Sequence, residues 1–384
     1  MHWHLVTGEF PPQPGGVSDY TLSVARGLAS AGESVHVWCP TASHPAPQVP
    51  GVVVHAMAGT WGREDIARVD RELDATPAPR RLLVQWVPHA YGQRSMNVGF
   101  CRWIRRRGLK GDAVELMAHE AYLGFREGSW KHDVAATVHR LMVSLLLSVS
   151  RRVWVSIPAW VSRMRPYAFG RRIEFCWLPV PSTVPVVNDP VRVREVRARY
   201  ATAHGPLVGH FGTYGTDSRH DLEPLIASVV RDPHAVSMVL IGRESDVFLR
   251  EIVSRHPEIA GRVHAAGTLS PEALSVSLQA CDVLVQPYVD GASSRRTTLM
   301  AALAHGVPVV TTEGRLSEAV WRETNAVRLV PPRDPDAAAR AVVALCSDTA
   351  EQARLTTAAR ALYADRFDLS HTIHALIAES CRAA

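Results

Sequence analysis

The chain lacks the features that would place it in several common classes. No apolar run reaches the roughly 18 residues that a membrane-spanning helix needs. The opening MHWHLVTGEF has neither the basic start nor the apolar core of a secretion signal. The six cysteines form no CxxC pair, so most are expected to be reduced core residues. These absences predict a cytoplasmic protein without a membrane-spanning segment.

Recognition motifs for metals and nucleic acids are also missing. The D-x-D triplet Asp334-Pro335-Asp336 is predicted to start a helix rather than to hold a metal, and the sequence has no cluster of metal ligands, no GxGxxG fingerprint and no basic patch interleaved with aromatic residues, so no metal and no nucleic-acid partner are expected. The net charge of +5 is modest for 384 residues and permits anionic substrates or an anionic membrane surface. The densest cationic segment, 102–110, predicts a solvated helix face, with contact to a membrane surface as the alternative.

What the chain does have is a regular alternation of apolar strands and helical segments. With 47% hydrophobic and 21% charged residues, it is long enough for two full cores. The alternation predicts an α/β fold of two Rossmann-like halves with mostly parallel sheets. The proline-rich segment 176–190 is typical of a linker, so the predicted domains are 1–180 and 181–365, with a final amphipathic helix, about 366–384, packing back on the first. Strands are predicted near 5–7, 35–39, 52–55, 81–87, 114–117, 153–156, 207–211, 236–241, 263–264, 283–286, 307–312 and 327–330.

The segment 282–312 organises the second half of the chain, with the pattern of a strand, a loop, a helix and a strand. Ser293 and Ser294 are predicted to cap the helix, because their hydroxyls can accept its free N–H groups. Arg295 and Arg296 would then lie at a helix N-terminus and at the carboxyl end of a strand, which suits a phosphate or pyrophosphate. The alternative is that both arginines are solvated or paired with nearby carboxylates.

Glycines and polar side chains follow several of the other predicted strands, where the ligands of parallel α/β folds bind. Gly15 and Gly16, just before a helix from about Val17, can let backbone amides approach a ligand, or they form an ordinary tight turn. The other strand-end segments are likewise either ligand contacts or structural turns. The candidates at these strand ends are Gly15, Gly16, His89, Tyr91, His119, Glu120, Gly212, Thr213, Tyr214 and Arg243.

Three segments resemble the GT-B glycosyltransferases of the retaining family 4 type. PPQPGGVSDY is similar to that family's glycine loop, GTLSPEALSVSLQACDVLVQP to its C-terminal signature, and MAALAHGVPVVTT to its E-A-M-A-x-G-x-P-V-V segment. The resemblance spans nearly the whole chain. It implies two Rossmann-like domains that face each other across a cleft. It also implies retaining transfer of a sugar from a nucleotide-diphosphate sugar to an acceptor hydroxyl, with no metal and no other cofactor.

The resemblance also assigns roles to residues. His119 is similar to the family's cleft histidine that contacts the donor sugar, and Glu120 joins it as the second catalytic candidate and lines the acceptor side. The further acceptor candidates are Glu9, Asp19, His89 and Tyr91. The donor candidates are Gly15, Gly16, Gly212, Thr213, Tyr214, Arg219, Arg243, Ser293, Ser294, Arg295, Arg296 and Thr297.

The sequence departs from the family at its two usual glutamates, eight positions apart, where Ser293 and Ala301 stand. Thr213 also replaces an expected arginine, so we expect Arg295 and Arg296 to neutralise the pyrophosphate. Ala301 cannot hydrogen-bond a ribose 2′-hydroxyl. A donor with deoxyribose (a dTDP-sugar) has no such hydroxyl and would therefore lose the least binding energy. A UDP- or GDP-hexose remains open, since Thr297 could hold the ribose.

The Ala- and Arg-rich composition fits a high-GC bacterium, where unusual sugars decorate secondary metabolites. A bacterial polysaccharide is the other pathway considered. Two rival functions remain: a catalytically degenerate nucleotide-sugar-binding protein, and a nucleotide-sugar 2-epimerase of the same architecture. The donor sugar, the acceptor and the oligomeric state do not follow from the sequence.

Overall fold

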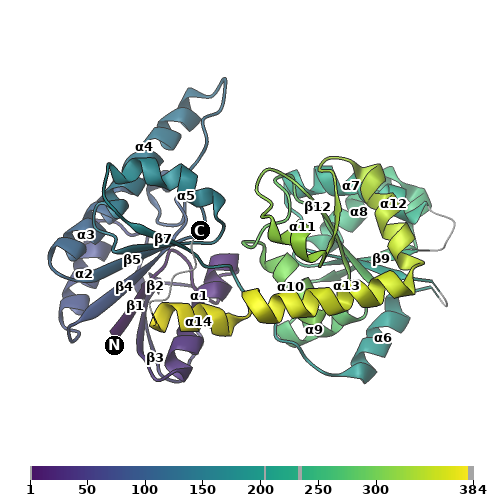
Figure 1. Ribbon diagram of the computed structural model, residues 1–384, viewed down its shortest axis with the longest axis horizontal. Helices are drawn as coiled ribbons and strands as arrows, with labels where there is room; N and C mark the ends of the chain where they lie inside the picture. Colours follow the sequence, from purple (N-terminus) through teal and green to yellow (C-terminus); the bar gives the residue numbers. More distant parts are fainter. Residues whose placement is uncertain (1, 203–204, 232–235, 379–384) are drawn as a thin grey trace. The chain divides into compact units, whose positions relative to one another are not determined.

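The computed structural model describes residues 2–202, 205–231 and 236–378, and these divide into two compact units. The first unit holds the described chain up to Val180 together with the segment from Leu369, and the second is Pro181–Asp368. Each unit is a parallel sheet with helices packed on both of its faces (Figure 1). The α/β fold with two mostly parallel sheets, predicted from the alternation of strands and helices, is confirmed.

Within the described residues, the first unit has a seven-stranded sheet in the order β3-β2-β1-β4-β5-β6-β7, with every neighbouring pair parallel. Helix α14 returns from the end of the chain to pack on α1, where Gly27 leaves room for Ile373. The elements are β1 His2–Val6, α1 Gly16–Ser30, β2 Ser34–Pro40, β3 Val52–Ala58, α2 Arg63–Asp74, β4 Arg80–Trp86, α3 Val98–Leu109, β5 Ala113–Ala118, α4 Trp130–Leu147, β6 Arg152–Val155, α5 Ala159–Met164, β7 Glu174–Trp177 and α14 Leu369–Ile377, with short 3₁₀ turns at Gln93–Ser95 and Arg165–Ala168. Residues 379–384 of the predicted tail helix, with Cys381, lie outside the described residues.

The described part of the second unit forms a six-stranded parallel sheet in the order β10-β9-β8-β11-β12-β13. Its central strands are short apolar runs that are buried on both sides, as parallel strands between two helical layers require. The elements are α6 Pro190–Tyr200, β8 Leu207–Phe211, α7 Thr216–Val230, β9 Ser237–Ile241, α8 Ser245–Arg255, β10 Val263–Gly267, α9 Pro271–Gln279, β11 Val283–Gln286, α10 Thr297–His305, β12 Val309–Thr312, α11 Val320–Thr324, β13 Arg328–Val330, α12 Pro335–Cys346 and α13 Thr349–Leu362, with single turns at Pro257–Ile259 and Tyr363–Phe367.

Most cysteines are reduced, as predicted: Cys39, Cys101, Cys281 and Cys346 are free thiols. Cys176, which lies inside β7 rather than in the predicted linker, is disulfide-bonded. One expectation about side chains needs correction. The cationic segment 102–110 is only partly a solvated face. Its Arg107 is fully buried in α3 and pairs with Asp74 and Asp112, because helix α2 and the turn before β5 bring carboxylates to it.

No helix within the described ranges is both long and apolar enough to cross a membrane.

Histidines from three neighbouring strands stack on one face of the first sheet. His4 lies opposite His36 in the register of β1 and β2, and Trp38 lies opposite His55 in that of β2 and β3. The Trp38 Nε1–H donates to His4 Nδ1 at 3.1 Å, and His36 Nδ1 lies 3.0 Å from His55 Nε2. Burial lowers the pKa of His4 to about 3 and that of His55 to about 4. The cluster is therefore neutral in the folded protein near pH 7.

We expect this cluster to make the first unit sensitive to acid. An unfolded histidine has a pKa near 6.5, so below that pH the unfolded chain binds protons that the folded chain excludes, and stability falls as the pH is lowered from about 6.5 toward 4. Thermal melts at several pH values give the pH dependence of stability, and its slope gives the number of protons taken up on unfolding. For His55→Phe, which keeps a ring on Trp38, that number should be lower by about one. His44→Phe, at an exposed loop position, is the control. Identical pH slopes for His55→Phe and the native chain would contradict the expectation.

Candidate functional site

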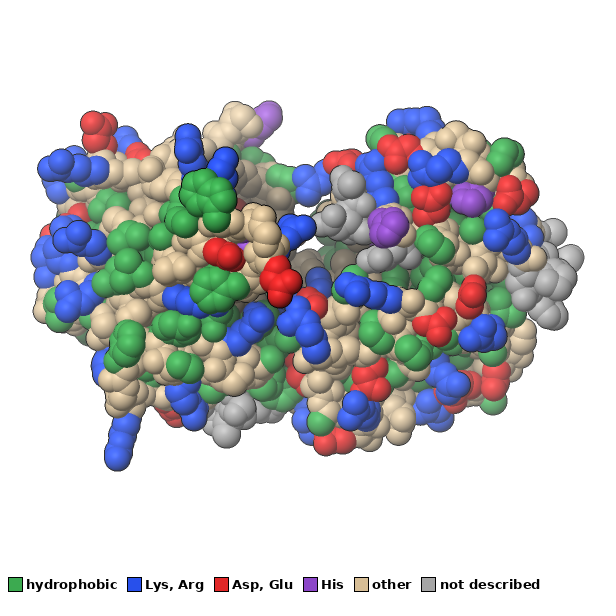
Figure 2. Space-filling model, turned by 90° about the horizontal axis from the view of Figure 1, so that it is seen from above, with side chains coloured by type: hydrophobic (Ala, Val, Ile, Leu, Met, Phe, Trp, Pro, Cys, Tyr) green, Lys and Arg blue, Asp and Glu red, His purple; other side chains and the backbone are tan. Residues whose placement is uncertain are grey.

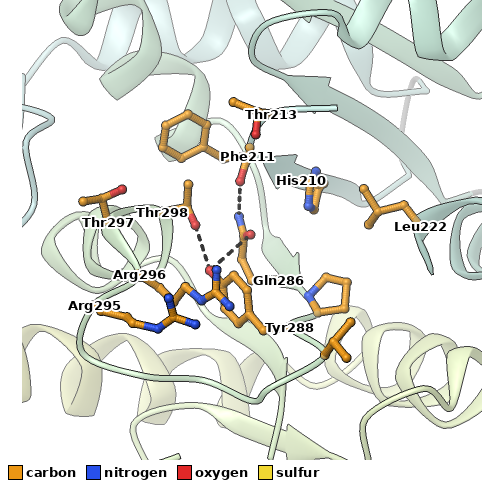
Figure 3. A pocket seen from close by; sticks show the side chains of 13 residues that line it. His210, Phe211, Thr213, Leu222, Gln286, Tyr288, Arg295, Arg296, Thr297 and Thr298 are labelled. Atoms are coloured by element: carbon orange, nitrogen blue, oxygen red, sulfur yellow. Dashed lines mark hydrogen bonds between the residues drawn. The ribbon is translucent and has the colours of Figure 1, made fainter. Parts of the chain in front are cut away.

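A cavity of about 360 Å³ lies at the carboxyl edge of the second sheet (Figure 3). It is bounded by the end of β8 and the turn after it (210–213), by the end of β11 and its following residues (286–289), and by the entry to α10 (295–298). Leu222 of α7 completes the lining. The site is therefore built where a parallel α/β unit presents strand ends and a helix N-terminus together.

Tyr288 is the centre of the cavity's polar wall. Its hydroxyl lies 2.7 Å from Thr298 Oγ1, and the Arg296 guanidinium lies 4.7 Å from the centre of its ring. Gln286 fixes the neighbouring strand end by donating from Nε2 to the carbonyl of Phe211 at 3.0 Å (Figure 3). The buried Arg296 Nε has no hydrogen-bond partner among the described residues. Stacking therefore holds the guanidinium in place at the wall of the cavity.

The loop before α10 differs from its predicted form. Helix α10 begins at Thr297 with Arg296 as its N-cap residue, so Ser293 and Ser294 do not cap it. Ser294 instead donates from its backbone N and its Oγ to Glu318 Oε1, at 2.9 and 2.5 Å. Both serines are fully buried, and Ser293 Oγ has no hydrogen-bond partner within the described part of the chain. The predicted end of the helix is confirmed, since Gly306 takes a left-handed conformation after His305.

Glu318 was not a candidate from the sequence, yet it anchors this loop. Its second oxygen accepts from Trp321 Nε1 at 2.7 Å, and burial raises the pKa of its carboxyl. It lies 24 residues from Ser294, and no spacing pattern connects the two positions. In the sequence, Glu318 is recognisable only as a polar residue shortly after β12, which does not indicate that it anchors the loop.

A close backbone contact holds the same loop from the other side. Gly291 has φ +89°, and a Cβ there would come within 2.2 Å of the Gly314 nitrogen, so only glycine fits. Asp290 accepts from Arg315 at 2.5 Å and lies 3.6 Å from an Arg295 guanidinium nitrogen. The loop that carries the two arginines is thus fixed before any ligand binds.

The structure brings five predicted donor residues to the cavity: Gly212, Thr213, Arg295, Arg296 and Thr297. Arg219 is instead paired with Glu244 at 2.9 Å and Glu251 at 2.6 Å. Tyr214 is fully buried against His210, and Arg243 is exposed after β9. Ala301, which carried the argument about the ribose, is fully buried and not among the residues that line the cavity.

In the first unit, His119 follows β5 and is 8% exposed. Its Nε2 lies 2.8 Å from Gln85 Oε1, and the ring of Tyr20 meets it edge-on at 4.8 Å. Its carbonyl accepts from Ser156 Oγ and Trp160 Nε1 at 3.1 and 3.0 Å. Burial lowers the pKa of His119 to about 3, so the imidazole is neutral and acts only through hydrogen bonds. Gln85, its partner, was predicted only as part of a strand.

The predicted acceptor residues separate into two groups. His89 is exposed and Glu120 is half-buried, and His89 Nδ1 lies 3.8 Å from Glu120 Oε2. Asp19 is exposed in the first turn of α1. Tyr91 is fully buried, and its hydroxyl donates to the carbonyls of Gln85 and Val6, so its prediction as an acceptor contact is wrong for this structure. Tyr91, an aromatic residue that follows a strand, packs in the core instead of facing a ligand.

The glycine loop of the first unit is already filled by the protein's own carboxylate. Glu9 Oε1 accepts from the backbone amides of Val17 and Ser18, at 3.1 and 2.9 Å. A Cβ on Gly15 would meet that oxygen at 2.3 Å, so the glycine makes room for Glu9. The predicted role of Glu9 as an acceptor contact and of Gly15 and Gly16 as an open anion site is therefore corrected: Glu9 caps α1.

Two parallel α/β units of this kind, with polar groups gathered at their strand ends, define the GT-B fold, and the predicted GT-B fold is confirmed. Residues 206–348 match the family model described as "Glycosyl transferases group 1", which covers most of the second unit. No curated protein matches the chain in sequence. No group of three or more His, Cys, Asp or Glu side chains that could hold a metal occurs among the described residues.

Solved structures resemble the whole chain. Sucrose-phosphate synthase from Thermosynechococcus elongatus has a TM-score of 0.73 at 17% identity, over 99% of this chain and 100% of its own. HepE from Anabaena, in complex with UDP and glucose, has a TM-score of 0.71 at 18% identity, over 99% and 98%. WaaG, a glycosyltransferase involved in lipopolysaccharide biosynthesis, has a TM-score of 0.70 at 15% identity, over 97% and 98%. At these identities the likeness establishes the fold alone.

Proposed function

We propose that the protein is a retaining glycosyltransferase that moves a sugar from a nucleotide-diphosphate sugar to an acceptor hydroxyl. The observation that carries the proposal is the cavity of the second unit, where Arg295 and Arg296 meet the N-terminus of α10 and the backbone after β8. Guanidinium groups and helix amides are the groups that bind a diphosphate. The family match over the same unit and the UDP and glucose bound to HepE support this choice of ligand.

In this proposal the leaving diphosphate gains negative charge as the bond to the sugar breaks, and the arginines and helix amides stabilise that charge without a metal. Departure and attack on one face of the sugar would give retention. His119, neutral and oriented by Gln85, would hydrogen-bond the donor sugar. His89 and Glu120, which lie close together, would contact the acceptor.

The finer points are also proposals. A dTDP-linked deoxy or otherwise unusual sugar is the donor we favour, because Ala301 and Ser293 replace the two carboxylates expected to hold the ribose and the sugar. Secondary-metabolite or polysaccharide synthesis in a bacterial cytoplasm is the corresponding setting. The same missing carboxylates favour a second candidate, a nucleotide-sugar-binding protein without catalysis.

Isothermal titration of the purified protein with dTDP, UDP, GDP and ADP in EDTA tests the proposal. We expect binding of at least one nucleoside diphosphate, and dTDP alone if the deoxyribose inference holds. Equal or tighter binding of UDP or GDP would discard that inference and keep the glycosyltransferase. No binding of any would contradict the proposed donor site. Binding without sugar transfer to any acceptor, or hydrolysis of the matching donor, would favour the non-catalytic protein.

A further inference from the structure

Helix α4 of the first unit is apolar on two opposite faces. One face packs inward with Ala136, His139, Met142, Val143 and Leu146. The other carries Trp130, Val134 and Leu141, which are 72%, 48% and 51% exposed. The spacing of these three residues places them on one stripe of the helix, directly away from the core. A helix of a soluble domain normally turns charged or polar residues outward, so this stripe needs a partner.

The loop before α4 extends the apolar stripe with an aromatic residue held by a cation. Phe125 is 62% exposed, and the Arg140 guanidinium lies 4.0 Å from the centre of its ring. Arg126 and Lys131 are exposed beside it, and Lys131 Nζ lies 5.8 Å from the centre of the Trp130 ring. The exposed end of the helix thus combines large apolar rings with basic side chains.

Cations also border the other end of the stripe. Arg105 of α3 donates from Nε to Ser148 Oγ, just after α4, at 3.2 Å, and Arg102 is exposed one turn earlier on α3. Against these positive charges the segment 122–147 holds only Glu127 and Asp133, and Asp133 caps the local turn by accepting from the Arg126 amide. Figure 2, seen from above Figure 1, shows green and blue side chains over the first unit with few red ones between them.

We propose that this α4 surface docks the protein onto an anionic lipid surface. Rings and aliphatic side chains that project between Lys and Arg groups match the boundary between acyl chains and anionic headgroups. A second copy of the chain fits less well, because a shared stripe would bring the cations of both copies together and lysine is depleted at protein interfaces. The surface lies in the first unit and outside the nucleotide cavity, so the inference does not rest on the proposed function.

The test is co-sedimentation with vesicles of phosphatidylcholine containing phosphatidylglycerol, against vesicles of phosphatidylcholine alone. The native chain should bind the anionic vesicles, and added salt should weaken binding. Trp130→Ser combined with Val134→Ser should lower the partition coefficient at least about tenfold, because two exposed side chains lose their apolar burial. Lys131→Glu should weaken binding to anionic vesicles. Val191→Ser, a 53% exposed valine on α6 of the second unit, is the matched control and should change nothing.

Thermal melts of each variant establish that it is folded, since the exchanged side chains are exposed in the native chain. Absence of binding to the anionic vesicles by the native chain would overturn the proposal. Binding that the double variant retains in full would do the same. A native dimer in light scattering that the double variant loses, without lipid binding, would assign the stripe to a second copy and also overturn it.

Discussion

Replacing Arg295 and Arg296 together by alanine is expected to weaken nucleoside-diphosphate binding about 100-fold or more. A hydrogen bond to a charged group contributes about 1.5–3 kcal/mol, and about 1.4 kcal/mol corresponds to a factor of ten in affinity. Arg296 should account for much of the loss. Its guanidinium is already stacked on Tyr288, so little ordering is needed when a diphosphate binds. Titration calorimetry with the tightest-binding diphosphate measures the effect.

The matched control for the double variant is Arg250→Ala, which removes an exposed arginine of α8 in the same unit. It should leave the affinity within about twofold. Arg296→Lys should recover only part of the binding, because an ammonium group cannot reproduce the planar stack or a two-pronged contact. An unchanged affinity in the double variant would remove these arginines from the diphosphate site.

Replacing Glu318 by alanine should damage both the second unit and its ligand site. The change leaves the buried donors of Ser294 and Trp321 without their acceptor. A buried donor that loses its partner costs about 1–3 kcal/mol, so the loss in unfolding free energy should be roughly 3–5 kcal/mol. The loop that carries Arg295 and Arg296 then loses its anchor, and nucleotide affinity should fall even though Glu318 does not touch the ligand.

Glu318→Gln separates these two effects. The amide oxygen can still accept from Ser294, so the chain should remain folded with a smaller loss of stability in thermal melts. If Glu318 positions the arginines, nucleotide binding in this folded variant should still be several-fold weaker than in the native chain. Glu313→Ala, which breaks a surface ion pair with Arg322 in the same segment, is the control. A folded Gln variant with native affinity would leave Glu318 with a purely structural role.

The two sheets were predictable from local patterns because a buried parallel strand needs a short apolar run and a loop must follow it. The end of α10 at Gly306 was predictable for a similarly local reason, since a left-handed residue must close the helix. The loop before α10 was not predictable. Ser293 and Ser294 have the residue types of a helix cap, but Glu318, distant in sequence, competes for Ser294 in the folded chain.

The part of the candidate site that depends on local sequence patterns was also predictable. Arg295, Arg296 and Thr297 were located by a strand, a loop and a helix that follow one another, so their placement at a strand end needed no long-range information. Tyr91 and Arg219 were misjudged because their partners come from other elements. The Tyr91 hydroxyl reaches carbonyls of β1 and β4, and Arg219 of α7 reaches Glu251 of α8 and Glu244 just before that helix.

The Glu9 carboxylate occupies the N-terminus of α1, so any other anion must compete with it for the amides there. The amides of Val17 and Ser18 can hold one oxyanion at a time, and Glu9 is tethered beside them. A free phosphate would bind there only in molecules whose Glu9 side chain has swung away, so its apparent affinity is reduced by the fraction of such molecules. The chain therefore carries its own intramolecular competitor in one unit, whereas in the other unit no described carboxylate accepts a hydrogen bond from Arg296 Nε.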